Sequence, residues 1–560
     1  MQKATFIKPT KAQESSNAIE RLYIGMRHLF NRGFYKPMGV SGKTLREALL
    51  FLRPEIYGSI AEDKTEFEGL KYIIDRLPMG IEECQYINLT ADEGFRNSTF
   101  KVIIPPKRRR NCYRIDADQM NIEVTRGRSE IYDILTHLTF LFIESQKIQK
   151  NVLINVEGKT IREWLFLEEV VLNNKKLAKK EREVLLAHLT IILGRTFEEI
   201  KKADKDFAIP ENENRFFNLI YWMGKRALNE VLLDEKHVIT FSSALRERIG
   251  HHIYGEVWAN NIKKVLENNQ LLDREIHIIS ANMHSVMNSI YAPIVLKKEA
   301  SKHKDTALFE LLSEPENKDL RKQVMDFAAK KGLIYIEDTS GTNINVQVID
   351  TSKIDFKASN YDFKNEKKPV LIVMDYAFGE QAYETMDELL KPYTCKKGHL
   401  HHLHVESISI MGKAGILQGG KGDIMIPTAH LFEGTADNYP FYNELQIEQF
   451  KGVDLGVFQG TMVSVLGTSL QNKDLLEFFK NSTWRAIGLE MEGAHYQKAI
   501  QAASKIRGNI QSDVKVRYAY YASDNPLETG STLASGGLGT TGVKPTYIIT
   551  QKILEQIFKA

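Results

Sequence analysis

The first half of the chain carries a helical pattern of apolar and polar positions. Between about residues 15 and 270, apolar residues recur three and four positions apart, as in 130–148 and 181–200. This spacing places the apolar side chains along one face of a helix. Two exceptions, 99–106 and 152–158, are rich in β-branched residues, as strands prefer. The pattern therefore predicts a mainly helical domain over residues 1–273.

The pattern changes near residue 274, where short apolar runs begin to alternate with helical stretches. These runs lack a strict alternation of apolar and polar residues, which is typical of strands that are buried on both faces of a sheet. The expected strands lie in residues 276–280, 332–338, 370–375, 407–412, 423–427, 460–465, 486–492 and 516–524. We therefore expect an α/β domain over residues 274–560, with helices on both faces of a central sheet in three α/β/α layers.

The chain closes with a Gly-, Ser- and Thr-rich run, residues 530–542, and then a helical pattern. The apolar positions of that pattern fall largely on one side of a helix: Tyr547, Ile549, Ile553, Leu554 and Ile557. The Gly-rich run is too long for a tight turn and too short for a disordered linker. It is either a mobile loop near a functional site or a plain surface loop.

Composition and charge narrow the range of functions. The 560 residues carry 75 basic and 72 acidic side chains, and this net charge of +3 indicates neither nucleic acid nor an anionic membrane as a partner. The most basic run, Lys107 to Arg110, is either a phosphate contact or solvated loop charge. Three cysteines without CxxC spacing, no signal peptide and no apolar run long enough to cross a bilayer favour a cytoplasmic protein.

Polar residues follow four of the expected strands directly. In open α/β sheets ligands gather at the carboxyl ends of the strands, so these junctions are the candidate sites. They hold Asn282, His284 and Ser285; Asp375 to Glu380; Glu490 and Glu492; and Ser523 and Asp524.

Two of these junctions carry a resemblance to a known family. The pairs Met491–Glu492 and Ser523–Asp524, with the segments 408–435 and 460–465 between the other strands, resemble the purine nucleoside phosphorylase and nucleosidase superfamily. Within it, SDNPL at 523–527 looks most like the corresponding stretch of AMP nucleosidase. The resemblance covers about residues 275–560 and implies a phosphorylase-like domain with a central mixed sheet. It does not extend to the first 270 residues.

The resemblance and the chemistry agree on two catalytic carboxyls. Breaking an N-glycosidic bond builds negative charge on the departing base, and Asp524 can donate a proton to purine N7 if burial raises its pKa. An ionised Glu492 can accept hydrogen bonds from two ribose hydroxyls, while Met491 packs against the sugar and Ser523 lies beside the base. The alternatives are a loop or N-cap role for Asp524 and a surface glutamate opening a helix for Glu492. Glu490 should face the other way.

The central turn of the superfamily indicates the reaction type. Its phosphorylases place an Arg and a hydroxyl residue at positions that correspond here to Ile410 and Lys413, so phosphate would be poorly held and water is the expected nucleophile. Gly412, Lys413 and Gly415 in this turn are expected to line the substrate. Asn282 also belongs to the expected binding site, and His284 and Glu380 are candidates to position the water.

The sequence as a whole predicts hydrolysis of a purine nucleotide such as AMP to free base and ribose 5-phosphate. The alternatives are a phosphorylase or nucleosidase acting on an unphosphorylated nucleoside, and a nucleotide-binding regulator without turnover. No metal or organic cofactor is expected, because this chemistry requires none. The histidines His399, His401, His402 and His404 match no closed zinc site. Lys421, Arg517 and the Gly-rich run are possible 5′-phosphate contacts. The superfamily implies a homo-oligomer.

Overall fold

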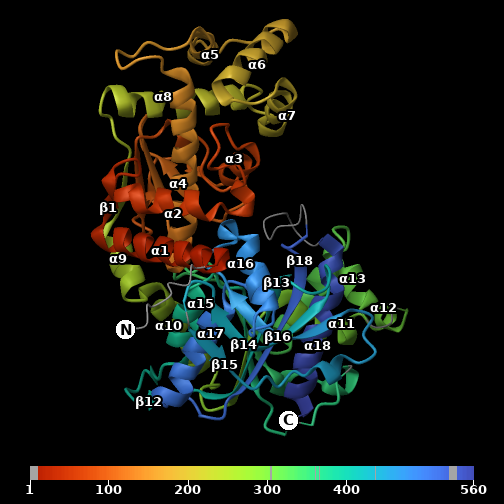
Figure 1. The fold of residues 1–560 in the computed structure, drawn as a ribbon. Coiled ribbons are helices and arrows are strands. Elements are labelled where there is room, and N and C mark those ends of the chain that lie inside the picture. Colours follow the sequence, from red (N-terminus) through yellow and green to blue (C-terminus); the bar gives the residue numbers. More distant parts are fainter. Residues whose placement is uncertain are drawn as a thin grey trace, which may run out of the picture. The chain divides into compact units, whose positions relative to one another are not determined.

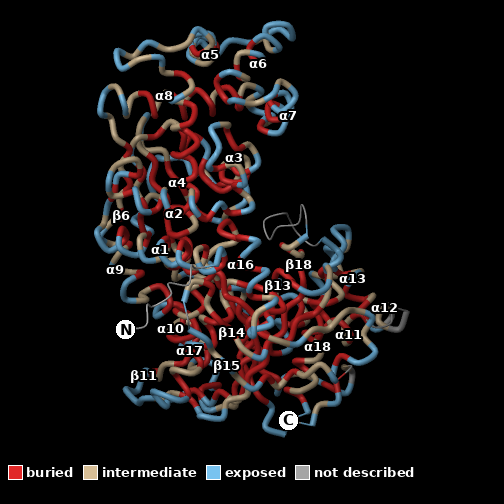
Figure 2. The backbone as a smooth tube through the Cα atoms, viewed as in Figure 1, coloured by how far each residue is buried: buried red, intermediate tan, exposed pale blue. Residues whose placement is uncertain are grey.

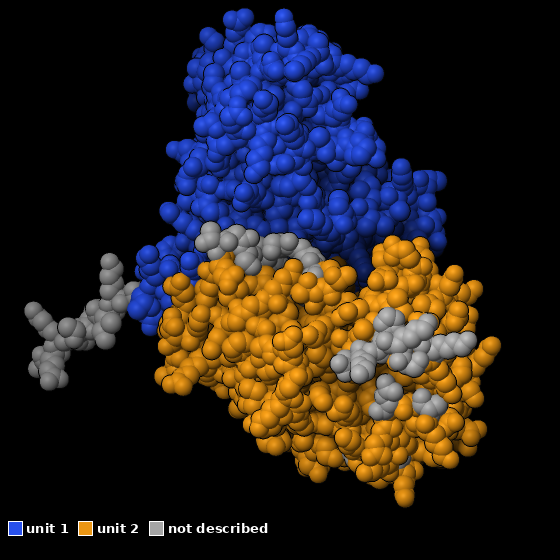
Figure 3. All heavy atoms as spheres, turned by 90° about the vertical axis from the view of Figure 1, so that its right-hand side faces the viewer, with its two compact units in different colours: residues 1–125, 130–250, 469–475 blue, residues 126–129, 251–468, 476–560 orange. Residues whose placement is uncertain are grey.

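The computed structural model describes residues 10–302, 306–359, 361–364, 366–435, 437–528 and 539–559. The contacts divide the chain into two compact units, which are coloured separately in Figure 3. The first holds residues 1–125, 130–250 and 469–475, and the second holds residues 126–129, 251–468 and 476–560. The predicted Gly-rich loop falls mostly in 529–538, outside the described residues.

The first unit combines helices with a sheet. Its helices are α1 (Lys11–Arg32), α2 (Lys43–Leu52), α3 (Phe67–Ile74), α5 (Arg162–Leu172), α6 (Lys179–Leu193), α7 (Phe197–Phe207), α8 (Arg215–Leu232) and α9 (Ser243–Gly250). The long helix α4 (Gly127–Val152) starts in the second unit and continues in the first from Glu130. Strands β1 (Phe34–Tyr35), β2 (Tyr86–Thr90), β3 (Val102–Ile103), β4 (Cys112–Arg114), β5 (Gln119–Glu123) and β6 (Val238–Phe241) form one sheet in the order β1-β6-β2-β5-β4-β3.

This six-stranded sheet is a feature of the otherwise mainly helical first half of the chain that the sequence pattern did not predict. Its strands are five residues long or shorter, so none produces the long alternating pattern that would reveal it. Of the two expected strands, 99–106 contains only β3. In 152–158, Val152 ends α4 and Leu153 makes an isolated bridge with Thr160.

The basic run Lys107 to Arg110 folds back onto helix α4. The Arg108 guanidinium makes two hydrogen bonds of 2.9 Å to the Asp133 carboxylate, and Arg110 Nε lies 3.1 Å from Glu130 Oε1. The side chain of Arg110 is 1% exposed. These two arginines are therefore internal ion-pair partners rather than solvated charge.

The second unit alternates strands and helices along the chain (Figure 1). Its helices are α10 (Ile253–Asn268), α11 (Met283–Val295), α12 (Lys297–Lys302), α13 (Ala307–Ser313), α14 (Lys318–Lys330), α15 (Gln381–Leu390), α17 (Gly493–Gln501) and α18 (Val543–Lys559); α16 (Lys473–Asn481) is shared with the first unit. Its strands are β7 (Glu275–Ser280), β8 (Leu333–Ile336), β9 (Val346–Asp350), β10 (Val370–Met374), β13 (His404–Ile416), β14 (Ile424–Phe432), β15 (Asn438–Pro440), β16 (Val457–Ser464), β17 (Ala486–Glu490) and β18 (Lys515–Asp524), with β11 (Tyr393–Thr394) and β12 (Leu400–His401) as a separate pair.

The sheet of this unit is mixed, as the resemblance implied. Its order is β15-β14-β16-β17-β13-β7-β10-β9-β8, and β18 pairs with β13 and β14. Strand β7 runs parallel to β10 and β13, and β13 runs parallel to β18, whereas β17 meets β13 in antiparallel register. Each of the eight expected runs contains a strand, while β9 and β15 were not expected.

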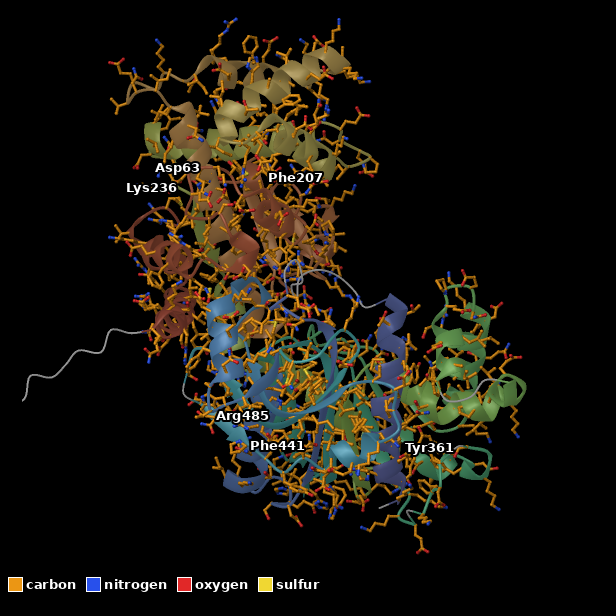
Figure 4. All side chains as sticks on the ribbon, turned by 45° about the vertical axis from the view of Figure 1, so that its right-hand side comes forward. Asp63, Phe207, Lys236, Tyr361, Phe441 and Arg485 are labelled. Carbon is orange, nitrogen blue, oxygen red and sulfur yellow. The ribbon has the colours of Figure 1, made fainter. Side chains whose placement is uncertain are left out.

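Helices cover both faces of the sheet, which gives the three predicted layers. One apolar cluster joins α10, α15 and α17 to one face, and the other joins α11, α13, α14 and α18 to the opposite face. Phe441 packs on the first cluster and Tyr361 on the second (Figure 4), and the central strands are buried along most of their length (Figure 2). The five apolar positions predicted for the last helix are all buried in α18. None of the helices in the described residues combines the length and the apolar character that a bilayer crossing requires.

The division into units does not follow the predicted boundary at residue 274. Helix α10 lies before that position, yet its Trp258 and Ile262 are buried in the same cluster as α15 of the second unit. The Trp258 indole also donates a hydrogen bond of 2.9 Å to the Ile344 carbonyl. The contacts therefore assign α10 to the second unit.

Candidate active site

The end of strand β17 carries two glutamates with different partners. The Glu490 carboxylate accepts hydrogen bonds from the backbone N–H groups of Glu492 and Gly493 and from the Ser464 hydroxyl. It thereby satisfies N–H groups that the first turn of α17 leaves without helical partners. Burial raises the pKa of Glu490 to about 8. This residue has a structural role at the start of the helix.

Glu492 follows at the N-cap position of α17 and points elsewhere. Its Oε1 accepts a hydrogen bond of 2.9 Å from the Gly379 N–H, and its Oε2 lies 3.3 Å from the Met491 nitrogen. Burial raises the pKa of Glu492 to about 7, against the opposing effect of these N–H groups and of the Lys413 ammonium. The residue is half-buried, so it is not a freely solvated surface glutamate.

Asp524 ends strand β18 and is 7% exposed. The Ser523 hydroxyl lies 2.5 Å from Asp524 Oδ1 and 3.1 Å from the carbonyl oxygen of Ala414. Its other oxygen, Oδ2, is buried and has no hydrogen-bond partner among the described residues. Burial raises the pKa of this carboxyl, while the Ser523 hydroxyl and the ammonium groups of Lys413 and Lys421 oppose the rise. Such a carboxyl can hold a proton and present it to a ligand.

Lys413 links the two catalytic candidates, because its charge acts on both Glu492 and Asp524. It is exposed and lies in β13, three residues before the end of that strand. This strand runs without a break from His404 to Ile416, so the expected turn around Gly412, Lys413 and Gly415 is wrong. The chain turns later, in residues 417–423.

The glycines of β13 have other reasons for their positions. A side chain on Gly412 would contact the rings of Tyr376 and Tyr520, and Gly415 pairs with Asp524 at a bulge in the β13–β18 ladder. A bulge shifts the register by one residue and redirects the side chains beyond it. This shift places Gly415 beside the carboxyl that ends β18.

A cavity of about 560 Å³ extends from Lys413 toward α11 and α18. It is lined by Asn282, His284, Ser285, Asn288, Leu312, Ser313, Arg321, Lys413, Tyr521, Gly539, Gly542, Val543, Thr546 and Tyr547. The side chain of Asn282 caps α11, because its Oδ1 accepts a hydrogen bond of 2.9 Å from the His284 N–H. The exposed His284 side chain faces this cavity, so the structure brings Asn282, His284 and Lys413 together.

The other expected contacts lie in different settings. Glu380 is the N-cap residue of α15, and its Oε1 accepts a hydrogen bond of 2.9 Å from Arg128. Arg517 is buried and its Nε donates to Gln556, so it does not line the cavity. His402 Nδ1 lies 3.1 Å from the Asn509 carbonyl oxygen. No three His, Cys, Asp or Glu side chains of the described residues are grouped so that they could hold a metal ion.

Sequence reasoning did not single out two tyrosines at the site, although Tyr376 lies within the junction Asp375 to Glu380. Tyr521 lines the cavity, and its position near the end of β18, the strand that carries Ser523 and Asp524, could have revealed it. Tyr376 follows β10, is 39% exposed and lies near Gly412. An exposed aromatic ring at a strand end is a surface on which a purine can stack.

Comparisons with known proteins give one family and several partial structural similarities. No curated protein matches the sequence. The chain is similar to a 5′-methylthioadenosine/S-adenosyl homocysteine nucleosidase of Campylobacter jejuni, at 13% identity and a TM-score of 0.31 over 51% of this chain and 100% of that one. It is also similar to a futalosine hydrolase mutant of Helicobacter pylori, at 12% identity and a TM-score of 0.30 over 50% of this chain and 99% of that one.

Residues 43–304 and 306–559 match a family of unknown function, DUF6909. The two matched ranges include the strand-end residues described above as well as most of the first unit. The chain therefore belongs to the DUF6909 family.

Proposed function

We propose that the protein hydrolyses the N-glycosidic bond of a purine nucleotide such as AMP, releasing the free base and ribose 5-phosphate. The observation that carries the proposal is the pair of carboxyls around Lys413. Asp524 has a buried, unpartnered oxygen among the described residues and a raised pKa, while Glu492 is held by the Gly379 N–H. One carboxyl suits proton donation and the other suits binding of hydroxyls.

The chemistry assigns one task to each side chain. Asp524 donates its proton to purine N7 as the C1′–N9 bond breaks, so the base leaves neutral. Glu492 accepts hydrogen bonds from the 2′- and 3′-hydroxyls and offsets the positive charge that develops on the sugar. Water adds to C1′, and the proton that it releases restores Asp524. Met491 and Tyr376 provide apolar surface for the sugar and the base.

Two observations support a nucleotide and water rather than a nucleoside and phosphate. Lys413 and Arg321 line the cavity of about 560 Å³ beside the site, which has room and positive charge for a 5′-phosphate. Ile410, at the position where the superfamily's phosphorylases carry an Arg, is 3% exposed and packs in the apolar core. A buried isoleucine supplies no contact for inorganic phosphate.

The proposal is tested by incubating the protein with AMP, GMP, IMP and their nucleosides, each with and without inorganic phosphate, and separating the products. We expect base and ribose 5-phosphate from a nucleotide, at a rate that phosphate does not raise. Release of base only from nucleosides would reject the nucleotide substrate, and release that requires phosphate would reject hydrolysis. Absence of free base from every compound would reject the enzyme.

The phosphate contact is tested by Lys413→Met, with Lys451→Met as the control because Lys451 is exposed and lies outside the cavity. We expect kcat/KM to fall on the order of tenfold more for AMP than for adenosine in the first variant, since a hydrogen bond to a charged group is lost only with AMP. An equal loss for both substrates would contradict the phosphate role.

A further inference from the structure

Residues 126–129, from the first half of the chain, belong to the second unit. Residues 126–129 precede or begin α4, and the remainder of that helix belongs to the first unit. Ser129 is 4% exposed, and its Oγ accepts a hydrogen bond of 2.8 Å from the Glu380 N–H. Arg128 donates to the Glu380 carboxylate, and the Arg126 guanidinium lies 5.0 Å from the centre of the Phe378 ring. All of these contacts meet the turn between β10 and α15.

The same turn also supplies a hydrogen bond to the side chain of Glu492. Its Gly379 N–H donates to Glu492 Oε1 at 2.9 Å, and the next N–H along the chain, from Glu380, is the one that donates to Ser129. The N–H groups of two consecutive peptides therefore point at the Glu492 carboxylate and at the Ser129 hydroxyl. Fixing the second peptide group limits rotation of the first, because both are attached to the Gly379 Cα.

Gly379 makes this restraint necessary. Its φ is +55°, in the region where glycine moves freely and other residues are strained. A Cβ at this position would lie 2.3 Å from Ser129 Oγ, so only glycine allows the close approach. The carbonyls of Phe378 and Gly379 accept hydrogen bonds from the Gln381 and Ala382 N–H groups within the turn, and a contact from outside the turn adds a further restraint on these peptide groups. Without that external contact the peptide groups would rotate more, and Glu492 would lose its donor for part of the time. The Ser129 hydroxyl supplies that contact.

We infer that Ser129 and Arg128 are positioning residues that orient Glu492 through the Phe378–Glu380 turn. The inference rests on the proposed function for the role of Glu492. Its consequence is that the ribose site is completed by residues that precede the nucleosidase-like half of the chain. It also gives Glu380 a task other than acting on water, because its carboxylate is engaged by Arg128.

The first test compares Ser129→Ala with Ser145→Ala in the full-length protein. Ser145 lies on the same helix and is buried, but its hydroxyl donates to the Leu141 carbonyl within α4. We expect kcat/KM for AMP to fall on the order of tenfold in Ser129→Ala, and by less for 2′-deoxy-AMP, which lacks one of the hydroxyls that Glu492 accepts. A parallel loss for both substrates would mean that Ser129 only supports the fold, and would overturn the inference.

Arg128 provides a rescue experiment. Arg128→Met removes the ion pair with Glu380, whereas Arg128→Lys keeps a positive charge at the turn. We expect the methionine variant to lower the AMP to 2′-deoxy-AMP preference and the lysine variant to restore most of it. Arg182→Met is the matched control, because Arg182 has a similar exposure and forms an ion pair with Asp204 in the first unit. Equal behaviour of all three variants would contradict the positioning role.

Amide hydrogen exchange separates this inference from the proposed function. Peptides that cover residues 378–381 should exchange faster in Ser129→Ala than in the wild type, and at an unchanged rate in Ser145→Ala. If no compound is hydrolysed by the wild type, the proposed function fails while this measurement still decides whether Ser129 restrains the turn. Unchanged exchange in Ser129→Ala would overturn the inference whatever the catalytic result.

Discussion

The Asp524→Asn substitution tests the central assignment because it changes one property of the site. Asparagine has nearly the same shape as aspartate, so the contact of Oδ1 with the Ser523 hydroxyl is kept. The group at the position of Oδ2, which is buried without a partner among the described residues, becomes an NH₂ that can donate a hydrogen bond but cannot transfer a proton. The variant therefore removes acid catalysis and leaves the packing in place.

The expected loss follows from the contribution of a positioned acid. General acid catalysis contributes about 10²- to 10⁴-fold, or about 2.7–5.5 kcal/mol of barrier, so kcat for AMP should fall in that range. Folding should not suffer. Burial raises the pKa of Asp524, so its contribution to stability is lost as the pH rises through that pKa, and asparagine escapes this loss. We expect a melting temperature at pH 8 that is unchanged or higher.

The assay uses two substrates with different leaving groups. AMP needs a proton on its base, whereas 4-nitrophenyl β-D-ribofuranoside releases a stable phenolate without one. We expect Asp524→Asn to lose most of its activity on AMP and little on the nitrophenyl riboside. A similar loss on both substrates would refute the proton transfer and point to substrate positioning, and AMP turnover within about threefold of the wild type would refute any catalytic role.

Three further predictions follow from the buried charges. Glu492→Gln should lower kcat/KM for AMP by about 10- to 100-fold. It should also abolish the fall in activity below about pH 7 that we expect from protonation of Glu492 in the wild type. If the activity of the variant still falls below about pH 7, another group causes that fall. Burial raises the pKa of Glu433 to about 8, so its contribution to stability is lost as the pH rises from about 4.5 to 8. The free energy of unfolding of Glu433→Gln, measured in urea, should therefore exceed that of the wild type by up to about 5 kcal/mol at pH 9 but not at pH 4. Equal gains at both pH values would contradict this. Arg110→Met should lower the free energy of unfolding by about 3–5 kcal/mol, because it leaves Glu130 and Asp133 buried near an uncharged side chain. Arg109→Met, at an exposed neighbouring position, should change the free energy of unfolding by less than about 0.5 kcal/mol. Urea denaturation of both variants tests this prediction.

The sequence reveals the second unit well because its strands are buried on both faces. Continuous apolar runs such as 370–375 mark these strands, and polar residues follow the carboxyl ends of the strands in the structure. The first unit is harder because β2 and β5 contain Asn88 and Asn121, whose side chains hydrogen-bond to each other across the sheet at 3.0 Å. Polar residues paired across strands interrupt the apolar pattern, so the sheet has no clear signature in the sequence.

The candidate site is only partly visible in the sequence. Its carboxyls follow strands directly, so strand ends identify Glu492 and Asp524 as candidates. The contact between Ser129 and Glu380 joins positions 251 residues apart, and no local pattern encodes it. The burial that raises pKa values is also a property of the packed chain, so a sequence shows which carboxyls exist but not which of them hold a proton.

Under the proposed function, substrate binding completes the separation of charge at the site. In the free protein burial raises the pKa of both carboxyls, and Lys413 opposes the rise at each, so neither burial nor Lys413 distinguishes the acid from the acceptor. Ribose hydroxyls that donate to Glu492 stabilise its ionised form, whereas a purine that covers Asp524 excludes water and stabilises its protonated form. Binding therefore moves the two pKa values in opposite directions. The N–H of Gly379 already lowers the pKa of Glu492 in the free protein, so in the proposed mechanism the geometry of the turn bears on catalysis.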